Sequence, residues 1–186
     1  YIPLHSPDIG EKEREAVLSV LDSGELKGGG EFDRKCSDLI ESAFDANDVL
    51  MTTSCTHALE MAAHLLEIDD SDEVIVPSYT FPSTATAFVL RGADIVFCDV
   101  DERTLTMDPN HLSRLVHEST AAIVPVHYAG SSCRMDKILA IADNYDVPVI
   151  EDAAQGVNAK YYEDYLGTIG DIGCYSFQGT KSYVAG

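Results

Sequence analysis

The sequence has few basic residues: 12 lysines and arginines stand against 32 aspartates and glutamates, for a formal charge of -20 over 186 residues. A polyanion such as DNA is repelled by this charge, and no basic stripe offsets it. An anionic membrane surface is disfavoured for the same reason. We therefore expect no nucleic-acid and no membrane partner, while a small anionic ligand can still bind where local dipoles attract it.

Long apolar runs are also absent. No stretch of about 18 apolar residues exists, which excludes a transmembrane helix. The first residues have neither the basic nor the long apolar region of a signal peptide, and the sequence begins with Tyr1 rather than Met. The five cysteines form no C-x-x-C pair, so we expect reduced thiols, a cytoplasmic location and no metal site.

Two nucleotide-binding motifs are missing as well. The sequence has no G-x-x-x-x-G-K-[ST] phosphate loop. The glycines at 28–30 follow a predicted helix, and no G-x-G-x-x-G follows a predicted strand. A nicotinamide-dependent oxidoreductase is therefore a poor fit, although the alternation of helices and strands alone would allow it.

Helices and strands are predicted in alternation. Apolar residues recur at helical spacing over 11–23, 32–44, 56–66, 109–117 and 135–145, with a further helix after Pro82. Short runs rich in Val and Ile predict strands over 49–51, 74–76, 95–97, 121–126, 147–150 and 172–177, and a small hairpin is expected over 159–166. Continuous apolar strands are buried on both faces, so we predict an α/β fold: a mostly parallel sheet sandwiched by helices.

Polar residues stand where the predicted strands end. In open α/β sheets, ligands bind beyond the carboxyl ends of the strands. The segments in those places are Ser54-Cys55-Thr56, Ser78-Tyr79-Thr80-Phe81, His127-Tyr128, Glu151-Asp152, and Ser176 with Lys181.

Two of these residues carry distinctive chemistry. Lys181 follows a buried strand, and a lysine in a partly dry pocket can form a Schiff base. Asp152 ends an apolar strand, where a carboxylate is costly unless it is paired. Beneath a pyridine ring it could keep the ring nitrogen protonated, as pyridoxal phosphate chemistry requires. Taken singly, Lys181 also fits a surface loop, and Asp152 also fits a cap on the following turn.

A helix beginning near Ser54 would aim its N–H groups and the positive end of its dipole at a phosphate. Hydroxyls of Ser54, Thr56 and Ser176 could add donors. Plain N-capping by Ser54 or Thr56 is the alternative.

Three further residues have open interpretations. Phe81 could stack on a flat ring or pack in the core. Gln155, three residues after Asp152, could bond a ring oxygen or face solvent. His127 could act as a general base or be a hydrogen-bonded histidine at a strand end.

Taken in order, these motifs resemble the sugar-nucleotide aminotransferases of the DegT/DnrJ/EryC1/StrS family, which are fold-type I pyridoxal-phosphate enzymes. The matching stretches are 54–56, 77–81, 125–130, 151–156, and 173–177 leading to Lys181. Within the family, the tracts 59–63, 87–93 and 166–170 are similar to transaminases of dTDP-linked 4-keto-6-deoxy sugars.

The resemblance implies a large domain of fold-type I with bound pyridoxal 5'-phosphate. It implies that Lys181 binds the cofactor covalently and shuttles the proton, and that Asp152 pairs with the pyridinium nitrogen. Gln155 would contact the ring oxygen and Phe81 would stack on the ring. The phosphate would be held by Cys55, Thr56 and Ser176.

The resemblance also implies an activity. Glutamate would give its amino group to a nucleotide-linked 4-keto-6-deoxy sugar such as dTDP-4-keto-6-deoxyglucose, in the synthesis of precursors of cell-surface polysaccharides such as enterobacterial common antigen. The site would form in a homodimer. Relatives that carry histidine in place of the lysine are dehydratases, so Lys181 favours amino transfer.

The chain departs from the family pattern near its end. Gln178 and Gly179 stand where the family commonly has His followed by Glu or Pro, and Ser182 stands where Asn is common. We expect an N-terminal helix and glycine turn over 1–30, an incomplete cofactor-binding large domain over 31–186, and no small C-terminal domain. The truncated chain alone would then be inactive. The alternative is a non-catalytic remnant or dimerisation scaffold.

Overall fold

The computed structural model describes residue 2 and residues 6–184. These residues group into two compact units. One unit contains the described residues up to Met51 together with those from Gln178 onward, and the other is Thr52–Phe177.

The first unit contains two helices, α1 (Glu11–Ser23) and α2 (Glu31–Phe44), close to the predicted bounds. The Gly10 N–H donates to Glu13 Oε2 at 2.7 Å and so satisfies a donor at the start of α1. Gly24 ends the helix in the left-handed conformation, with φ 71°, which costs glycine little. Because no residue of α1 is buried, local capping rather than packing explains where this helix begins and ends.

The prediction of a strand over 49–51 is wrong, since residues 48–52 have no regular secondary structure. The Val49 N–H donates to the Glu41 side chain at 3.1 Å instead of to a neighbouring strand. Leu50 is 68% exposed. A short apolar run forms a strand only where a partner strand takes up its backbone groups.

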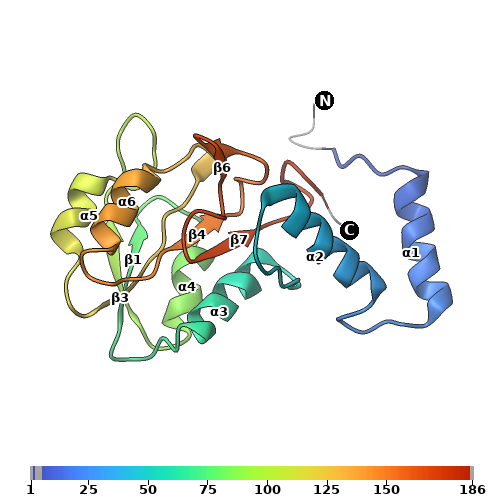
Figure 1. Ribbon diagram of the computed structural model, residues 1–186, viewed down its shortest axis with the longest axis horizontal. Helices are drawn as coiled ribbons and strands as arrows, with labels where there is room; N and C mark the ends of the chain where they lie inside the picture. Colours follow the sequence, from blue (N-terminus) through green and yellow to red (C-terminus); the bar gives the residue numbers. More distant parts are fainter. Residues whose placement is uncertain (1, 3–5, 185–186) are drawn as a thin grey trace. The chain divides into compact units, whose positions relative to one another are not determined.

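The second unit is built on parallel strands, as the sequence predicts (Figure 1). β1 (Glu73–Pro77) lies between β2 (Asp94–Cys98) and β3 (Thr120–Ile123). β4 (Ile150–Ala153) pairs with β7 (Ile172–Tyr175). Isolated parallel bridges, Ile123 to Val149 and Val126 to Asp152, join the two groups into the order β2-β1-β3-β4-β7.

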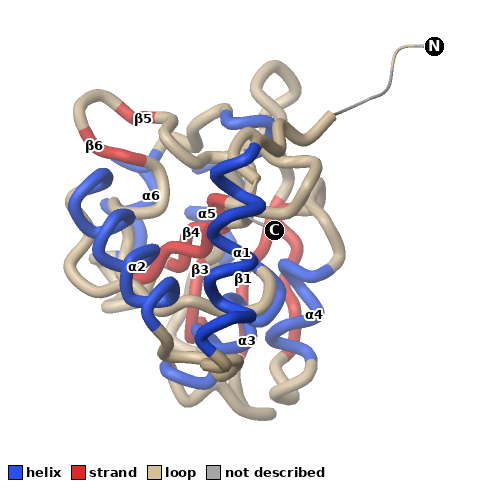
Figure 2. The backbone as a smooth tube through the Cα atoms, turned by 90° about the vertical axis from the view of Figure 1, so that its right-hand side faces the viewer, coloured by secondary structure: helices blue, strands red, loops and turns tan. Residues whose placement is uncertain are grey.

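Two pairs of helices cover the two faces of these strands. α3 (Cys55–Leu65) and α4 (Ser83–Val89) pack with Val74 and Val76, whereas Ile75 packs in the cluster of α5 (Pro109–Leu115) and α6 (Met135–Ala142). This alternation is the period of two expected for a strand. Figure 2 shows the strands of this unit running between its helices. Each large apolar side chain buried in this way contributes roughly 1.5–3 kcal/mol.

Three strand predictions need correction. β2 is not buried on both faces: Asp94 is exposed and Phe97 is 57% exposed, because β2 is an edge strand with β1 as its neighbour. The strand expected over 147–150 begins only at Ile150, since Pro148 has no N–H to donate to a ladder. The strand expected over 121–126 is shorter, since β3 spans Thr120–Ile123. Pro125, two residues further on, has no N–H to donate to a ladder.

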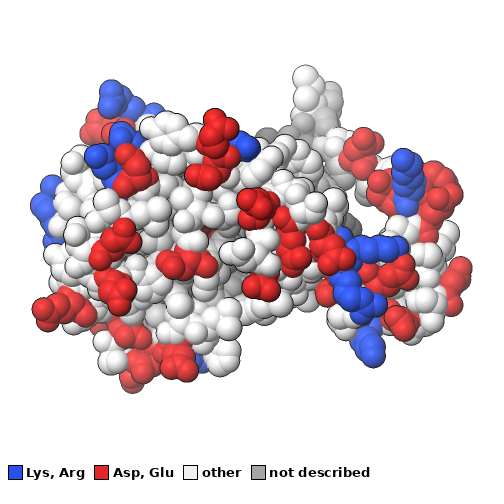
Figure 3. Space-filling model, viewed as in Figure 1, with Lys and Arg blue, Asp and Glu red and all other residues white. Residues whose placement is uncertain are grey.

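The small hairpin is present as β5 (Lys160–Tyr161) paired with β6 (Asp164–Tyr165). Within the described part of the chain, no helix is long and apolar enough to cross a membrane. Acidic side chains are spread over the face seen in Figure 3, with basic side chains in a few places between them.

Candidate active site

The order of the strands places a crossover between β1 and β3. The chain leaves β1 toward β2 on one side and returns to β3 on the other, and such a switch point is where open α/β sheets bind ligands. Tyr79 follows β1 and Tyr128 lies just beyond the chain that continues from β3, and their ring centroids are 4.4 Å apart. Interaction with the Tyr128 hydroxyl raises the pKa of Tyr79. The two sides of the crossover therefore meet at their carboxyl ends.

Asp152 lies in β4 and is only 5% exposed. Its Oδ2 accepts a hydrogen bond from the Thr84 hydroxyl at 2.7 Å, and its Oδ1 accepts one from the Ala154 N–H at 3.2 Å. The bond from Ala154 caps the following turn, which was the alternative interpretation of Asp152 from the sequence. Among the ion pairs of the described residues, none involves Asp152. A buried carboxylate with neutral donors alone is well placed to receive a cation from a ligand.

The strand register places further polar groups beside Asp152. Asp152 is the register partner of Cys174 in β7, so their side chains lie on the same face of the sheet. Ser176, two residues further along, is buried. The alternation of strand side chains places Ser176 on the Asp152 side, near the carboxyl end of β7.

The start of α3 lies against this face. The Cys55 thiol contacts the backbone oxygen of Cys174 at 3.7 Å. Ser54 is the N-cap, as one interpretation of the sequence held: its hydroxyl accepts from the His57 N–H at 3.2 Å. Thr56 lies in the first turn, where a backbone N–H has no acceptor within the helix. The N-terminus of α3 thus offers donors beside β7, which suits an anion.

Phe81 does not pack in the core, and Gln155 does not simply face solvent, which were the structural alternatives for these two residues. Phe81 is 69% exposed and so does not pack in the core. Gln155 is engaged rather than simply solvated, since its Oε1 accepts from the Ala129 N–H at 2.8 Å. This bond uses the amide oxygen and neither of the two amide N–H donors.

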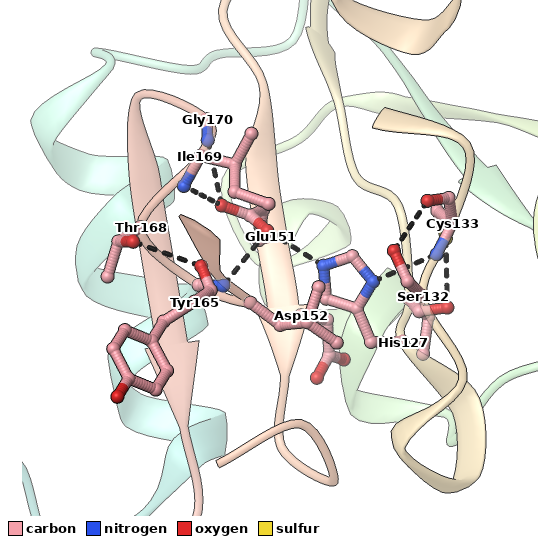
Figure 4. Close-up of polar contacts among 12 residues, drawn as sticks. His127, Ser132, Cys133, Glu151, Asp152, Tyr165, Thr168, Ile169 and Gly170 are labelled. Atoms are coloured by element: carbon pink, nitrogen blue, oxygen red, sulfur yellow. Dashed lines mark hydrogen bonds and ion pairs between the residues drawn. The ribbon is translucent and has the colours of Figure 1, made fainter. Parts of the chain in front are cut away.

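His127 is fully buried and hydrogen-bonded, the second of the two sequence interpretations (Figure 4). Its Nδ1 accepts from the Cys133 N–H at 3.2 Å, so the ring proton sits on Nε2, which donates to Glu151 at 2.8 Å. With both ring nitrogens occupied, His127 has no atom available to act as a general base.

Glu151 is the acceptor at the centre of this network. Its two oxygens accept from His127 and from the backbone N–H groups of Gly167, Ile169 and Gly170. Burial acts to raise the pKa of Glu151, but hydrogen bonding to His127 and to these backbone groups outweighs it, and the pKa is lowered. Glu151 therefore fastens the loop before β7 to β4.

Lys181 belongs to the other unit, so its place beside Asp152 remains a prediction. Its backbone N–H donates to the Gln178 carbonyl at 2.8 Å, which makes a turn. The Gln178 side chain accepts from both the N–H and the hydroxyl of Thr180. The departure from the family pattern at Gln178 thus supports the turn that carries the lysine.

The contacts of the second unit bring together Asp152, the start of α3 and the end of β7, three of the segments singled out in the sequence. Sequence reasoning assigned no role to Thr84 or to Glu151. No local signal distinguishes Thr84, because Ser83 and Thr86 of the same helix also carry hydroxyls. For Glu151 the signal is a second carboxylate beside Asp152.

An open parallel sheet with polar groups gathered at its carboxyl ends defines an α/β protein built to hold a small ligand at that edge. Residues 7–186 match the model of the DegT/DnrJ/EryC1/StrS aminotransferase family. The chain belongs to that family, as its motifs predicted.

Among curated relatives, the chain is 39% identical over 189 residues to the spore coat polysaccharide biosynthesis protein SpsC of Bacillus subtilis, covering 100% of this chain and 48% of SpsC. Among solved structures it is similar to an aminotransferase from Psychrobacter cryohalolentis, with a TM-score of 0.92 and 35% identity, covering 97% of this chain and 46% of that one. It is also similar to the GDP-4-keto-6-deoxy-D-mannose-3-dehydratase of E. coli with bound hydrated PLP, with a TM-score of 0.90 and 27% identity, covering 99% and 49%.

These comparisons confirm the fold class, the family and its cofactor: the family's solved structures include forms that hold PLP. They also show that both sugar aminotransferases and a sugar dehydratase share this fold. The chain spans about half the length of the curated relatives it matches, 48% for SpsC.

Proposed function

We propose that the chain is the cofactor-binding half of a PLP-dependent aminotransferase. Glutamate is the amino donor and a nucleotide-linked 4-keto-6-deoxy sugar is the acceptor, in the synthesis of precursors of cell-surface polysaccharides. The family membership supports the class of reaction. The observation that carries the proposal is Asp152: a buried carboxylate at the ligand-binding edge whose hydrogen-bond donors are both neutral.

The carboxylate of Asp152 fits the pyridine nitrogen of PLP. A protonated pyridine nitrogen is a cation that would complete the charge balance of Asp152. When bound, PLP supplies a ring that withdraws electrons from the bonds at the carbon bearing the amino group. Asp152 keeps the ring nitrogen in the protonated form on which that withdrawal depends.

The remaining contacts are proposed from the same edge of the sheet. Gln155 has amide donors for the phenolic oxygen, because its own oxygen is held by Ala129. The exposed ring of Phe81 can stack on a flat aromatic ligand. The first turn of α3, with Cys55 and Thr56, and the buried Ser176 hydroxyl supply donors for the phosphate.

Lys181 is proposed as the covalent attachment point of the cofactor and as the catalytic acid and base. Once the incoming amino donor has displaced it from the cofactor, its amine would carry the proton from the Cα of glutamate to the cofactor carbon in the first half-reaction. In the second it would carry a proton from that carbon to the sugar carbon that receives the amino group. A lysine at this position, rather than the histidine of the dehydratases, supports amino transfer over dehydration.

The finer assignment rests on the resemblance of the tracts 59–63, 87–93 and 166–170. We propose dTDP-4-keto-6-deoxyglucose, or a close relative, as the acceptor and dTDP-4-amino-4,6-dideoxygalactose as the product, a precursor of enterobacterial common antigen. We further propose a homodimer in the cytoplasm. The five cysteines form no C-x-x-C pair in the sequence, which supports a reducing compartment.

A second candidate is a non-catalytic remnant or a dimerisation scaffold. The chain spans 48% of the length of SpsC.

PLP titration followed by an amino-transfer assay tests these two functions. We expect the protein to bind PLP, measured by the change in cofactor absorbance, and Asp152→Asn to weaken binding by about ten-fold or more, since the buried charge is lost. Asp164→Asn, an exposed acid on the hairpin, is the matched control and should bind as the wild type does.

Transfer from glutamate to the dTDP-keto sugar then separates the candidates. Binding together with turnover supports the aminotransferase, and binding without turnover supports the remnant. Failure of the wild-type protein to bind PLP, or equal binding by Asp152→Asn, would contradict the proposed cofactor site.

A further inference from the structure

A buried hydroxyl donates a hydrogen bond to Asp152, the residue proposed to bind the ring nitrogen of PLP. Thr84 in α4 is 0% exposed, and its Oγ1 donates to Asp152 Oδ2 at 2.7 Å. The two residues are 68 positions apart in the sequence, and the bond joins helix α4 to strand β4.

The direction of this bond is fixed by chemistry. An ionised carboxylate can only accept, so the single hydroxyl proton of Thr84 goes to Asp152. Thr84 Oγ1 also lies 2.7 Å from Thr80 Oγ1. Because its own proton is used, Thr84 accepts from Thr80, and the three groups form a chain of donors that runs from Thr80 through Thr84 to the carboxylate.

Thr84 is the second residue of α4, so no earlier turn of this helix offers a carbonyl to its hydroxyl. The Thr84 hydroxyl reaches β4 instead. The other oxygen of Asp152 is held by the Ala154 N–H at 3.2 Å, so both oxygens are anchored and rotation of the carboxylate breaks one of the two bonds.

We propose that Thr84 is a positioning residue of this site, whose hydroxyl holds the Asp152 carboxylate in the orientation that receives the ring nitrogen of PLP. The inference rests on the proposed function and deepens it. Thr80 supports the same orientation one step further away. Neither threonine contacts the reacting atoms.

The first test compares two substitutions at one position with a matched control. Thr84→Val keeps the shape and removes the hydroxyl, and Thr84→Ser keeps the hydroxyl. Thr106→Val is the control, because Thr106 is also buried and its hydroxyl pairs with that of Thr104 at 2.9 Å, away from Asp152.

Each apo-protein is first shown to be folded by a cooperative unfolding transition. Its affinity for PLP is then measured by absorbance titration. A hydrogen bond to a charged group leads us to expect Thr84→Val to weaken PLP binding by roughly ten-fold. Thr84→Ser and Thr106→Val should stay within about two-fold of the wild type. Should Thr84→Val fail to fold, Thr80→Val takes its place, with an expected loss of about three-fold.

A double-mutant cycle separates positioning from general packing. If Thr84 acts through Asp152, adding Thr84→Val to Asp152→Asn changes PLP affinity by less than about two-fold. Equal losses in both backgrounds, or wild-type affinity in Thr84→Val, would overturn the positioning role while leaving the cofactor site standing. No binding of PLP by the wild-type protein would overturn the proposed function, and the positioning role with it.

Discussion

Replacing Glu151 by glutamine should strongly destabilise the Thr52–Phe177 unit. Oε2 of Glu151 accepts from His127 Nε2 at 2.8 Å and from the Gly167 N–H at 2.9 Å, and Oε1 accepts from the N–H groups of Ile169 and Gly170 at 2.7 Å each. Glutamine offers one oxygen, so two buried donors lose their acceptor and face an NH₂ group. At roughly 1–3 kcal/mol for each orphaned donor, we expect a loss of about 4 kcal/mol.

For a chain of this size that loss lowers the melting temperature by roughly 10 °C, measured by circular dichroism during thermal unfolding. Glu73→Gln is the matched control: it breaks another Glu–His pair, with His117 at 3.3 Å, but both side chains are partly exposed. Its expected cost is below about 1 kcal/mol. A loss below 1 kcal/mol for Glu151→Gln would refute the assignment of four donors to this carboxylate.

Three further predictions follow from the same unit. The folded-state pKa of Glu151 lies below the ordinary 4.5, so its contribution to stability is complete above that pH and is lost as the pH falls through the lowered value. Between about pH 5 and pH 3, the melting temperature should therefore fall less in Glu151→Gln than in the wild type. Gly173→Ala should cost about 3 kcal/mol in urea unfolding, since an added Cβ would lie 1.8 Å from the Gly167 carbonyl oxygen, and wild-type stability would show that this approach is not tight. Burial raises the pKa of the Cys133 thiol to about 12, so a thiol reagent should label the half-buried Cys36 first and Cys133 only on unfolding; early labelling of Cys133 would contradict its burial.

Local signals were sufficient for the helices. Gly24 marks the end of α1, and Asp108 followed by Pro109 marks the start of α5, where the Asp108 side chain accepts from the Asn110 N–H. Strands depend on a neighbour, which local sequence does not contain. The run 49–51 resembles the run 74–76 in composition, yet only the second lies between two other strands.

The candidate site was predictable where a residue is out of place in its own segment. Asp152 at the end of an apolar strand is such a residue, because the cost of burying a charge makes it conspicuous. Thr84 was not predictable, since a threonine in a short helix is unremarkable and its partner is 68 residues away. Phe81 was equally open from sequence, because composition does not tell an exposed aromatic ring from a core one.

Covalent trapping of PLP on the chain tests the central claim most directly. The protein is incubated with PLP, treated with borohydride to fix any lysine-bound cofactor, digested and analysed by mass spectrometry. Among the six lysines of the sequence, the added mass should fall on Lys181, should be absent in Lys181→Ala, and should be reduced in Asp152→Asn. Cofactor spread evenly over the lysines, or none on Lys181, would contradict the account.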